Sequence, residues 1–262
     1  MKLVRVLLLS SVLLAAPSLA STRSIEITDM WWTPGESGWG VNLILQNDTA
    51  YATFFLYGPT GDPVWYTAVL VYQGSSGGHQ TWSGPLYQTK GPWYGGPYTA
   101  GSIRQAGTAT FDLQATDQAT LTYLIDGLQV TKAVHRQTWK LEDLSGSYVG
   151  GYSIRSTSCT PASLNAQKDV IAPIAISQSG NTFTARLSDA SGISGVCSYT
   201  GTYTQAGKLG NVSGSYSCTD GTQGSFTLTE LTSTNNGFVA SMTGQNQFCQ
   251  WSGNLGGIKE AP

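Results

Sequence analysis

Histidine, methionine and charged side chains are scarce in this chain of 262 residues. It contains two histidines and three methionines, and Asp, Glu, Lys and Arg together make up only 11% of it. The catalytic motif H-E-x-x-H and the phosphate-binding glycine loop do not occur in the sequence. The sequence therefore favours a protein without catalytic activity, and it predicts no catalytic residue and no cofactor.

Long apolar runs are absent after residue 20. Met1–Ala20 combines a basic start at Lys2 and Arg5 with an apolar segment, and it ends in the small residues Ser18–Ala20. This order is typical of a secretory signal peptide. A membrane anchor is the alternative, but the apolar segment is shorter than the roughly 20 residues that a spanning helix needs. We therefore expect an exported protein, periplasmic or extracellular, with no transmembrane span.

Basic residues are few as well. Without residues 1–20, 11 Lys and Arg stand against 15 Asp and Glu, which is a net charge of −4. Binding to a nucleic acid backbone needs a clustered basic face, so nucleic acid is not an expected partner. Glycine, serine and threonine are abundant, and 11% of the residues are aromatic. This composition is typical of an all-β protein with many tight turns.

Cysteine is missing from the first half of the chain. All four cysteines, Cys159, Cys197, Cys218 and Cys249, follow residue 158. An even number of cysteines in an exported chain indicates disulfide bonds. A zinc site built from the four thiolates is the alternative, but no C-x-x-C pair is present, and no metal is predicted.

Tryptophan has the opposite distribution, since seven of the eight lie before residue 140. The two distributions together predict two domains with a boundary near Lys140–Leu144. We expect an all-β fold of two antiparallel meander domains, each closed fully or partly into an up-and-down, calycin-like barrel. The predicted parts are a signal peptide over 1–20, a Trp-rich β domain over 21–140 and a disulfide-bonded eight-stranded barrel over 144–258.

The first domain is organised around residues 31–66, which hold four tryptophans. The turn-forming pair Asn47-Asp48 predicts a hairpin in which Gln46 pairs with Thr49. This register places three pairs on one packed face: Leu43 with Ala52, Val41 with Phe54, and Trp39 with Leu56. Trp65 is expected to join this core.

Alternation of apolar and polar residues predicts the other strands of both domains. In the first domain they are expected over 24–28, 64–72, 81–88, 108–114, 120–125 and 129–139, with a loop over 31–38. In the second domain they are expected over 146–156, 169–177, 181–188, 196–204, 211–218, 224–231, 237–243 and 247–254.

The disulfide pairing follows from the strand order of the second domain. The turn at 205–210 sets Cys197 opposite Cys218 on neighbouring strands. Alternating strand directions place all four cysteines at one end of the barrel, and closure brings the first and last strands together. Of the three possible connectivities, this geometry predicts Cys197–Cys218 and Cys159–Cys249.

Residues 31–66 begin with W-W-x-P-x-E-S-G-W-G and end with the turn and strand G-x-P-x-W-Y. With these motifs, the chain resembles a module that recurs in exported proteobacterial proteins. The resemblance continues through the segments AGTATF at 106–111 and LTYLIDGLQVTKAVHRQTW at 121–139 and covers about 110 residues, roughly 30–139. It implies a β domain and carries no activity with it.

Aromatic residues in two loops are the candidate binding residues. One loop leads into the first hairpin, and the other, Lys90–Gly107, is too long for a simple turn and could act as a lid. Rings next to polar groups suit sugars or flat apolar ligands. The alternative is that these rings fill the barrel and the second loop straps one end. The predicted ligand-binding residues are Trp31, Trp32, Glu36, Trp93, Tyr94 and Tyr98.

These features favour an exported, non-enzymatic binding protein whose aromatic loops hold a small apolar molecule or a carbohydrate. A structural or surface-interaction protein that uses Ser/Thr faces and strand edges is the first alternative. A hydrolase that depends on Glu36 is the second, and in a purely structural role Glu36 would instead cap the backbone of its glycine-rich loop. His79 and His135 are expected to be surface or hydrogen-bonded residues.

Overall fold

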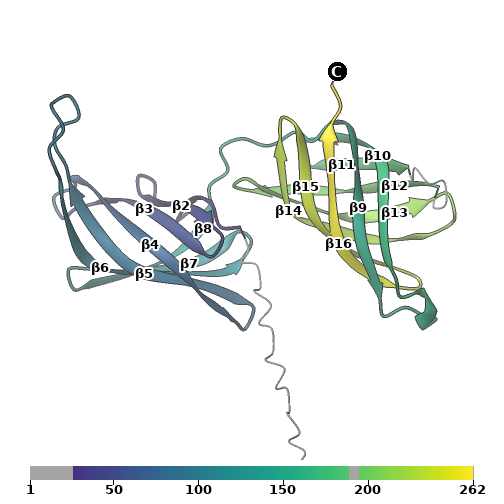
Figure 1. Cartoon of the computed structure of the whole chain (residues 1–262), viewed down its shortest axis with the longest axis horizontal. Helices are drawn as coiled ribbons and strands as arrows, with labels where there is room; N and C mark the ends of the chain where they lie inside the picture. Colours follow the sequence, from purple (N-terminus) through teal and green to yellow (C-terminus); the bar gives the residue numbers. More distant parts are fainter. Residues whose placement is uncertain (1–25, 189–194, 262) are drawn as a thin grey trace, which may run out of the picture.

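The chain folds into two closed antiparallel β-barrels of eight strands each (Figure 1). The structure is a computed structural model, and it describes residues 26–188 and 195–261. The predicted signal peptide over 1–20 lies outside the described residues. Within both barrels every strand pairs with its neighbours in sequence, and the first strand pairs with the last. The predicted all-β fold of two up-and-down barrels is confirmed.

The strands of the two barrels are continuous and joined mostly by short turns. The first barrel contains β1 Asp29–Trp32, β2 Gly40–Gln46, β3 Thr49–Tyr57, β4 Pro63–Ser76, β5 His79–Lys90, β6 Ser102–Ala115, β7 Gln118–Ile125 and β8 Leu128–Arg136. The second contains β9 Gly146–Thr157, β10 Gln167–Ser179, β11 Thr182–Ser188, β12 Val196–Ala206, β13 Leu209–Cys218, β14 Gln223–Thr234, β15 Gly237–Asn246 and β16 Gln250–Lys259. A short 3₁₀ helix, η1 Ala162–Leu164, lies between β9 and β10.

The first barrel is filled by its own large side chains. Trp31, Phe54, Trp82 and Phe111 are completely buried, and the Trp31 and Phe111 rings meet edge to face with centroids 4.9 Å apart. Two of the three predicted hairpin pairs of β2 and β3 are present, Leu43 with Ala52 and Val41 with Phe54. The pair of Trp39 with Leu56 is not formed, because the strand pairing stops at Gly40 and Phe55. A barrel of eight strands has just enough interior for such side chains, so its centre is a core and holds no open chamber.

Arg136 closes the end of the first barrel from which β1 starts. We call this end the base and the opposite end the rim. The guanidinium group lies 4.5 Å from the centroid of the Trp31 ring and donates a hydrogen bond of 3.2 Å to Asp29 Oδ2. It also donates to the carbonyl oxygens of Glu26 and Thr116. These partners satisfy a charge that is buried against the core.

The second barrel has an aromatic core and two disulfides. Cys197 pairs with Cys218 across β12 and β13, and Cys159 pairs with Cys249. Both bonds are those expected from the strand order. The predicted register is also correct, since Tyr199 faces Tyr216 and the two rings stack at 5.3 Å. The eight predicted strands are all present, although the last is shifted and begins at Gln250.

Three details of the first barrel differ from the sequence-based expectations. The first strand is β1, and residues 26–28 are not in a strand, so the prediction of a strand over 24–28 is wrong for them. Trp31 and Trp32 lie in β1 rather than in a loop, because they pair with β8 at the barrel closure. Trp65 is 61% exposed, since Tyr66 takes the inward position of β4.

The turn between β12 and β13 packs against the base of the first barrel. The Lys208 backbone N–H donates to Asp29 Oδ2 at 2.9 Å, and the Gly207 N–H donates to Thr138 Oγ1 at 2.9 Å. Leu209, at the end of the same turn, is completely buried. The two barrels therefore meet through this joint as well as through the connecting segment 137–145.

Candidate functional site

The rim of the first barrel carries an ion pair between Glu36 and Lys132. Their side chains approach to 2.7 Å, and the Trp39 indole N–H donates to the same Glu36 oxygen at 2.9 Å. Lys132 also lies 5.5 Å from the centroid of the Trp39 ring. The loop between β1 and β2 is thus held to β8 by one carboxylate.

This ion pair bears on the proposed catalytic role of Glu36. The hydrogen bond from Lys132, with a second from Trp39, lowers the pKa of the Glu36 carboxyl below its usual value. A general acid in glycoside hydrolysis needs a raised pKa, so the environment of Glu36 opposes that role. Its side chain bonds Lys132 and Trp39, and the expected capping of its own loop is not observed.

The outer surface of β2, β3 and β4 is unusually apolar. We call it the aromatic face, and its exposed members are Ile44, Tyr51, Phe55, Tyr57, Trp65, Val69 and Val71. The strand register arranges them in rows, with Phe55 opposite Trp65 and Tyr51 between Ile44 and Val69. Large exposed apolar patches on a soluble protein mark interaction sites. The rings of this face are the strongest candidate contacts of the molecule.

A polar row separates the apolar rows of the aromatic face. Asn42, Thr53 and Thr67 lie side by side on β2, β3 and β4. On the same strand, Tyr51 and Phe55 lie on either side of Thr53 and are about 13 Å apart along the strand. Flat rings therefore alternate with hydroxyl and amide groups on one surface.

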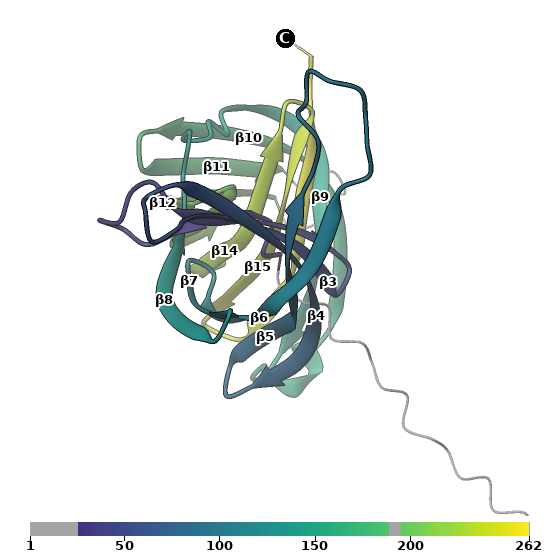
Figure 2. The same cartoon turned by 90° about the vertical axis from the view of Figure 1, so that its left-hand side faces the viewer.

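A second group of exposed rings lies on the loop between β5 and β6. We call residues 90–103 the aromatic finger, and Figures 1 and 2 show that it projects beyond the other loops of the first barrel. Trp93 is 70% exposed, Tyr94 97% and Tyr98 86%. The loop is shorter than predicted, since β5 runs to Lys90 and β6 starts at Ser102. These two strand ends lift the rings away from the barrel.

The six predicted ligand-binding residues are divided between four places: the core, the outer side of β1, the rim and the aromatic finger. Trp31 is buried in the core, so its predicted role as a surface contact is wrong. Trp32 is half-buried on the outer side of β1, and Glu36 belongs to the rim ion pair. Among the described residues, the ring contact of Trp93 is with Tyr94, and no hydrogen bond or ring contact joins the finger to the loop at 33–39. The structure does not bring the two predicted loops together.

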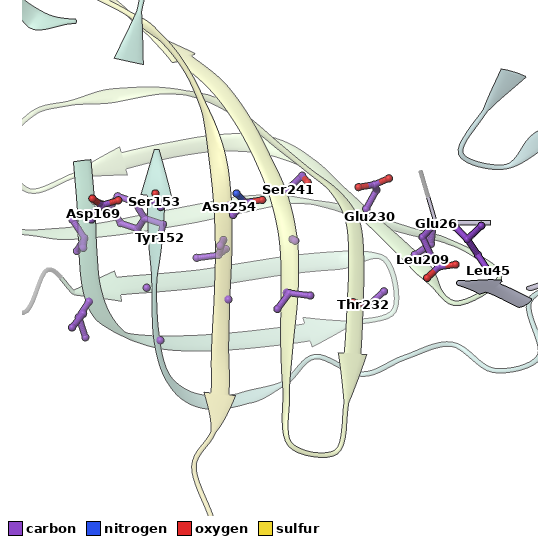
Figure 3. Close-up of a pocket in the computed structure, with 18 of the residues that line it drawn as sticks. Glu26, Leu45, Tyr152, Ser153, Asp169, Leu209, Glu230, Thr232, Ser241 and Asn254 are labelled. Atoms are coloured by element: carbon purple, nitrogen blue, oxygen red, sulfur yellow. The ribbon is translucent and has the colours of Figure 1, made fainter. Parts of the chain in front are cut away.

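A groove of about 1760 Å³ lies between the two barrels. One wall is the outer surface of β9, β10 and β14–β16, and the other includes Glu26, Leu45 and Asp48 at the base of the first barrel. Figure 3 shows Asp169, Ser153, Asn254 and Ser241 in a row across neighbouring strands, with Glu26 and Leu45 at the far end.

The groove carries several acidic side chains. Its lining includes the carboxylates Glu26, Asp48, Asp169 and Glu230. Hydrogen bonds from Ser153 and Gln167 lower the pKa of Asp169, and although burial alone raises the pKa of Glu26, bonds from Thr28 and the charge of Lys208 lower it. Within residues 26–188 and 195–261, no cluster of three or more His, Cys, Asp or Glu is placed to hold a metal ion.

The sequence contained a signal for the aromatic face in β3. Periodicity alone could not show which apolar residues of this strand point outward and which belong to the core. β3, with the sequence TAYATFFLY, carries apolar residues at both parities, so Phe54 points inward while Phe55 points outward. A half-buried strand normally alternates between apolar and polar residues. The surplus rings on the outward parity were the missed indication of the exposed aromatic face.

No protein-family model and no curated protein matches this chain. Among solved structures, it is similar to a crystal structure from Bacteroides fragilis described as that of a candidate outer membrane protein. The two share 15% sequence identity, the match covers 85% of this chain and 95% of the other, and the TM-score is 0.34. A likeness at this level carries no argument about function. The part of the chain that the structure describes has no helix long and apolar enough to cross a membrane.

Proposed function

We propose that this exported protein binds carbohydrate on the aromatic face of its first barrel. The observation that carries the proposal is the exposed ring of Trp65, paired with Phe55 and next to the polar row of Asn42, Thr53 and Thr67. A sugar ring has apolar faces and a polar edge. On such a surface, the apolar face of the sugar can stack on an aromatic ring, and its hydroxyl groups can form hydrogen bonds with the polar row.

The architecture supports a surface-bound ligand over an enclosed one. A small apolar molecule needs a concave site that removes most of its surface from water. The interior of the first barrel is filled by Trp31, Phe54, Trp82 and Phe111. An extended glycan needs no such cavity, because it can lie along the outside of several strands.

A structural or surface-interaction role that uses strand edges has less support than a ligand-binding role. Both barrels are closed, and closure removes the free strand edges through which sheets associate. Two disulfides support a protein that works in an oxidising, exported setting. A binding role at the cell surface or in the periplasm agrees with both features.

Affinity gel electrophoresis with soluble polysaccharides, together with pull-down on insoluble ones, tests the proposal. Trp65→Ala should weaken binding about tenfold, since one stacked ring contributes on the order of 1.4 kcal/mol. Trp139→Ala is the matched control, because Trp139 is 73% exposed on the segment between the barrels. The proposal fails if no polysaccharide binds the protein, or if both variants bind as well as the unaltered chain.

A further inference from the structure

We propose that the aromatic finger docks the protein on a phospholipid membrane by placing its rings in the interfacial layer of the bilayer. Trp93, Tyr94 and Tyr98 supply the rings, and Ile103 adds apolar surface where the finger joins β6. The partner is a lipid surface, and the residues are distinct from the aromatic face that is proposed to bind carbohydrate.

The rings of the finger are held outward by the backbone around them. The Gly96 N–H donates to the Trp93 carbonyl oxygen at 3.1 Å, which closes a tight turn at the tip. A Cβ atom on Gly95 would lie 2.5 Å from the Trp93 ring, so the turn packs directly on the indole. The Trp93 and Tyr94 rings lie 5.8 Å apart. Trp93 and Tyr94 are therefore preformed as a pair, which lowers the entropy cost of docking.

The chemistry of the finger favours lipid over sugar. Tryptophan and tyrosine have an apolar body and one polar group, and they collect where hydrocarbon meets water. A sugar site also needs side chains that form hydrogen bonds with the sugar hydroxyl groups, and the polar row of the aromatic face provides such side chains. Between Lys90 and Ser102 the residues other than the rings are glycine, proline, alanine and Thr99. This composition provides insertion without directional recognition.

The only charged residue within the finger, Lys90, complements an anionic membrane surface. The sequence contains no Asp or Glu between Asp62 and Asp112, whereas Lys90 is exposed where the finger begins. Arg104 is already paired with Asp126 at 2.6 Å and 2.7 Å. No carboxylate of this stretch would therefore be pressed against lipid phosphates, and Lys90 would be attracted to them.

The position of the finger allows it to reach a flat surface. The turn at Gly207 and Lys208 of the second barrel contacts the base of the first, which leaves the rim free. The finger extends from the rim beyond the neighbouring turns in both views (Figures 1 and 2). Its tip can meet a bilayer before the rest of the rim does.

Co-sedimentation with vesicles of phosphatidylcholine and phosphatidylglycerol tests this inference. The unaltered protein should sediment with the vesicles, and brominated acyl chains should quench part of its tryptophan emission. The triple variant Trp93→Ser, Tyr94→Ser, Tyr98→Ser should partition about tenfold less or weaker still. Trp93→Phe should still sediment but should lose most of the quenching, because Trp93 is the tryptophan placed in the bilayer.

Matched variants separate this inference from carbohydrate binding. Trp65→Ala and Trp139→Ala each remove an exposed ring outside the finger, and both should sediment like the unaltered protein. If the triple variant fails to fold, as near-UV circular dichroism would show, the single variant Trp93→Ser replaces it and should partition less. The inference is overturned if the unaltered protein stays in solution, if the finger variants sediment normally, or if Trp65→Ala loses as much binding as they do.

Discussion

At the scale of single residues, Arg136 shows how one side chain closes a barrel. The guanidinium group is surrounded by the Trp31 ring, the Asp29 carboxylate and two backbone oxygens. Burial lowers its pKa from the usual arginine value, and the charge of Asp29 opposes that shift. Arginine remains charged in proteins, so the group depends on these partners. Neither spacing nor composition marked it in the sequence, because its partners come from β1, from Glu26 before that strand and from the turn between β6 and β7.

Replacing Arg136 should therefore destabilise the first barrel strongly. Arg136→Ala leaves Asp29 buried without its cation and should lower the free energy of unfolding by about 3 kcal/mol or more in denaturant titrations. Arg104→Ala is the matched control, since it removes an exposed pair with Asp126 and should leave the free energy of unfolding nearly unchanged. Equal losses for the two variants would contradict the role given to Arg136.

At the scale of the strands, the two disulfides secure different parts of the second barrel. Cys197–Cys218 joins neighbouring strands whose turn already pairs them, across a separation of 21 residues. Cys159–Cys249 ties the segment after β9 to the start of β16, across 90 residues. The second bond therefore restricts a much longer loop of the unfolded chain.

Removal of the longer-range disulfide should be the more damaging change. The loop-entropy relation gives about 4.6 kcal/mol for the bond spanning 90 residues and about 3.3 kcal/mol for the one spanning 21. Cys159→Ser with Cys249→Ser should thus lower stability about 1 kcal/mol further than Cys197→Ser with Cys218→Ser. Denaturant midpoints of the two double variants measure the difference, and the reverse order would refute it.

At the scale of the whole molecule, the barrels are joined by a turn and by a fastened connection. The Gln205 side chain accepts a hydrogen bond from the Glu142 backbone N–H and donates one to the Lys140 carbonyl oxygen. Gln205 lies in β12, so this strand holds the connecting segment. Burial raises the pKa of Tyr203 to about 12, so its hydroxyl stays protonated and also donates to Gln205. Leu144, at the end of the segment, is completely buried in the second core.

A single methyl group should disturb this joint. In Gly207→Ala the new Cβ would lie 2.0 Å from Asp29 Oδ2, which would displace the turn from the base. Gly180→Ala is a matched control, because Gly180 has a φ of +57° against +56° for Gly207 and has open space around it. Both variants should lose about 1 kcal/mol to backbone strain.

Only Gly207→Ala should also displace the turn from the base and loosen the contact between the two barrels. Small-angle X-ray scattering should show an increased radius of gyration for this variant, and limited proteolysis should cut the segment 137–145 faster. The Gly180→Ala protein should match the unaltered chain in both measurements. Identical scattering from the two variants would show that the turn does not hold the barrels together.

The local and periodic features of this protein could be predicted from its amino-acid sequence. Turn residues and alternation specified two barrels, the hairpin at Asn47-Asp48 and the register of Cys197 with Cys218, because strand pairing between neighbours depends on short-range patterns. Which aromatic rings face water could be seen only in the packed barrel. Trp31 is buried through pairing with β8 and Trp65 is exposed because Tyr66 points inward. The burial of Trp31 depends on closure of the barrel, which brings together strands that are far apart in sequence, whereas the exposure of Trp65 depends on which side of β4 faces the filled interior.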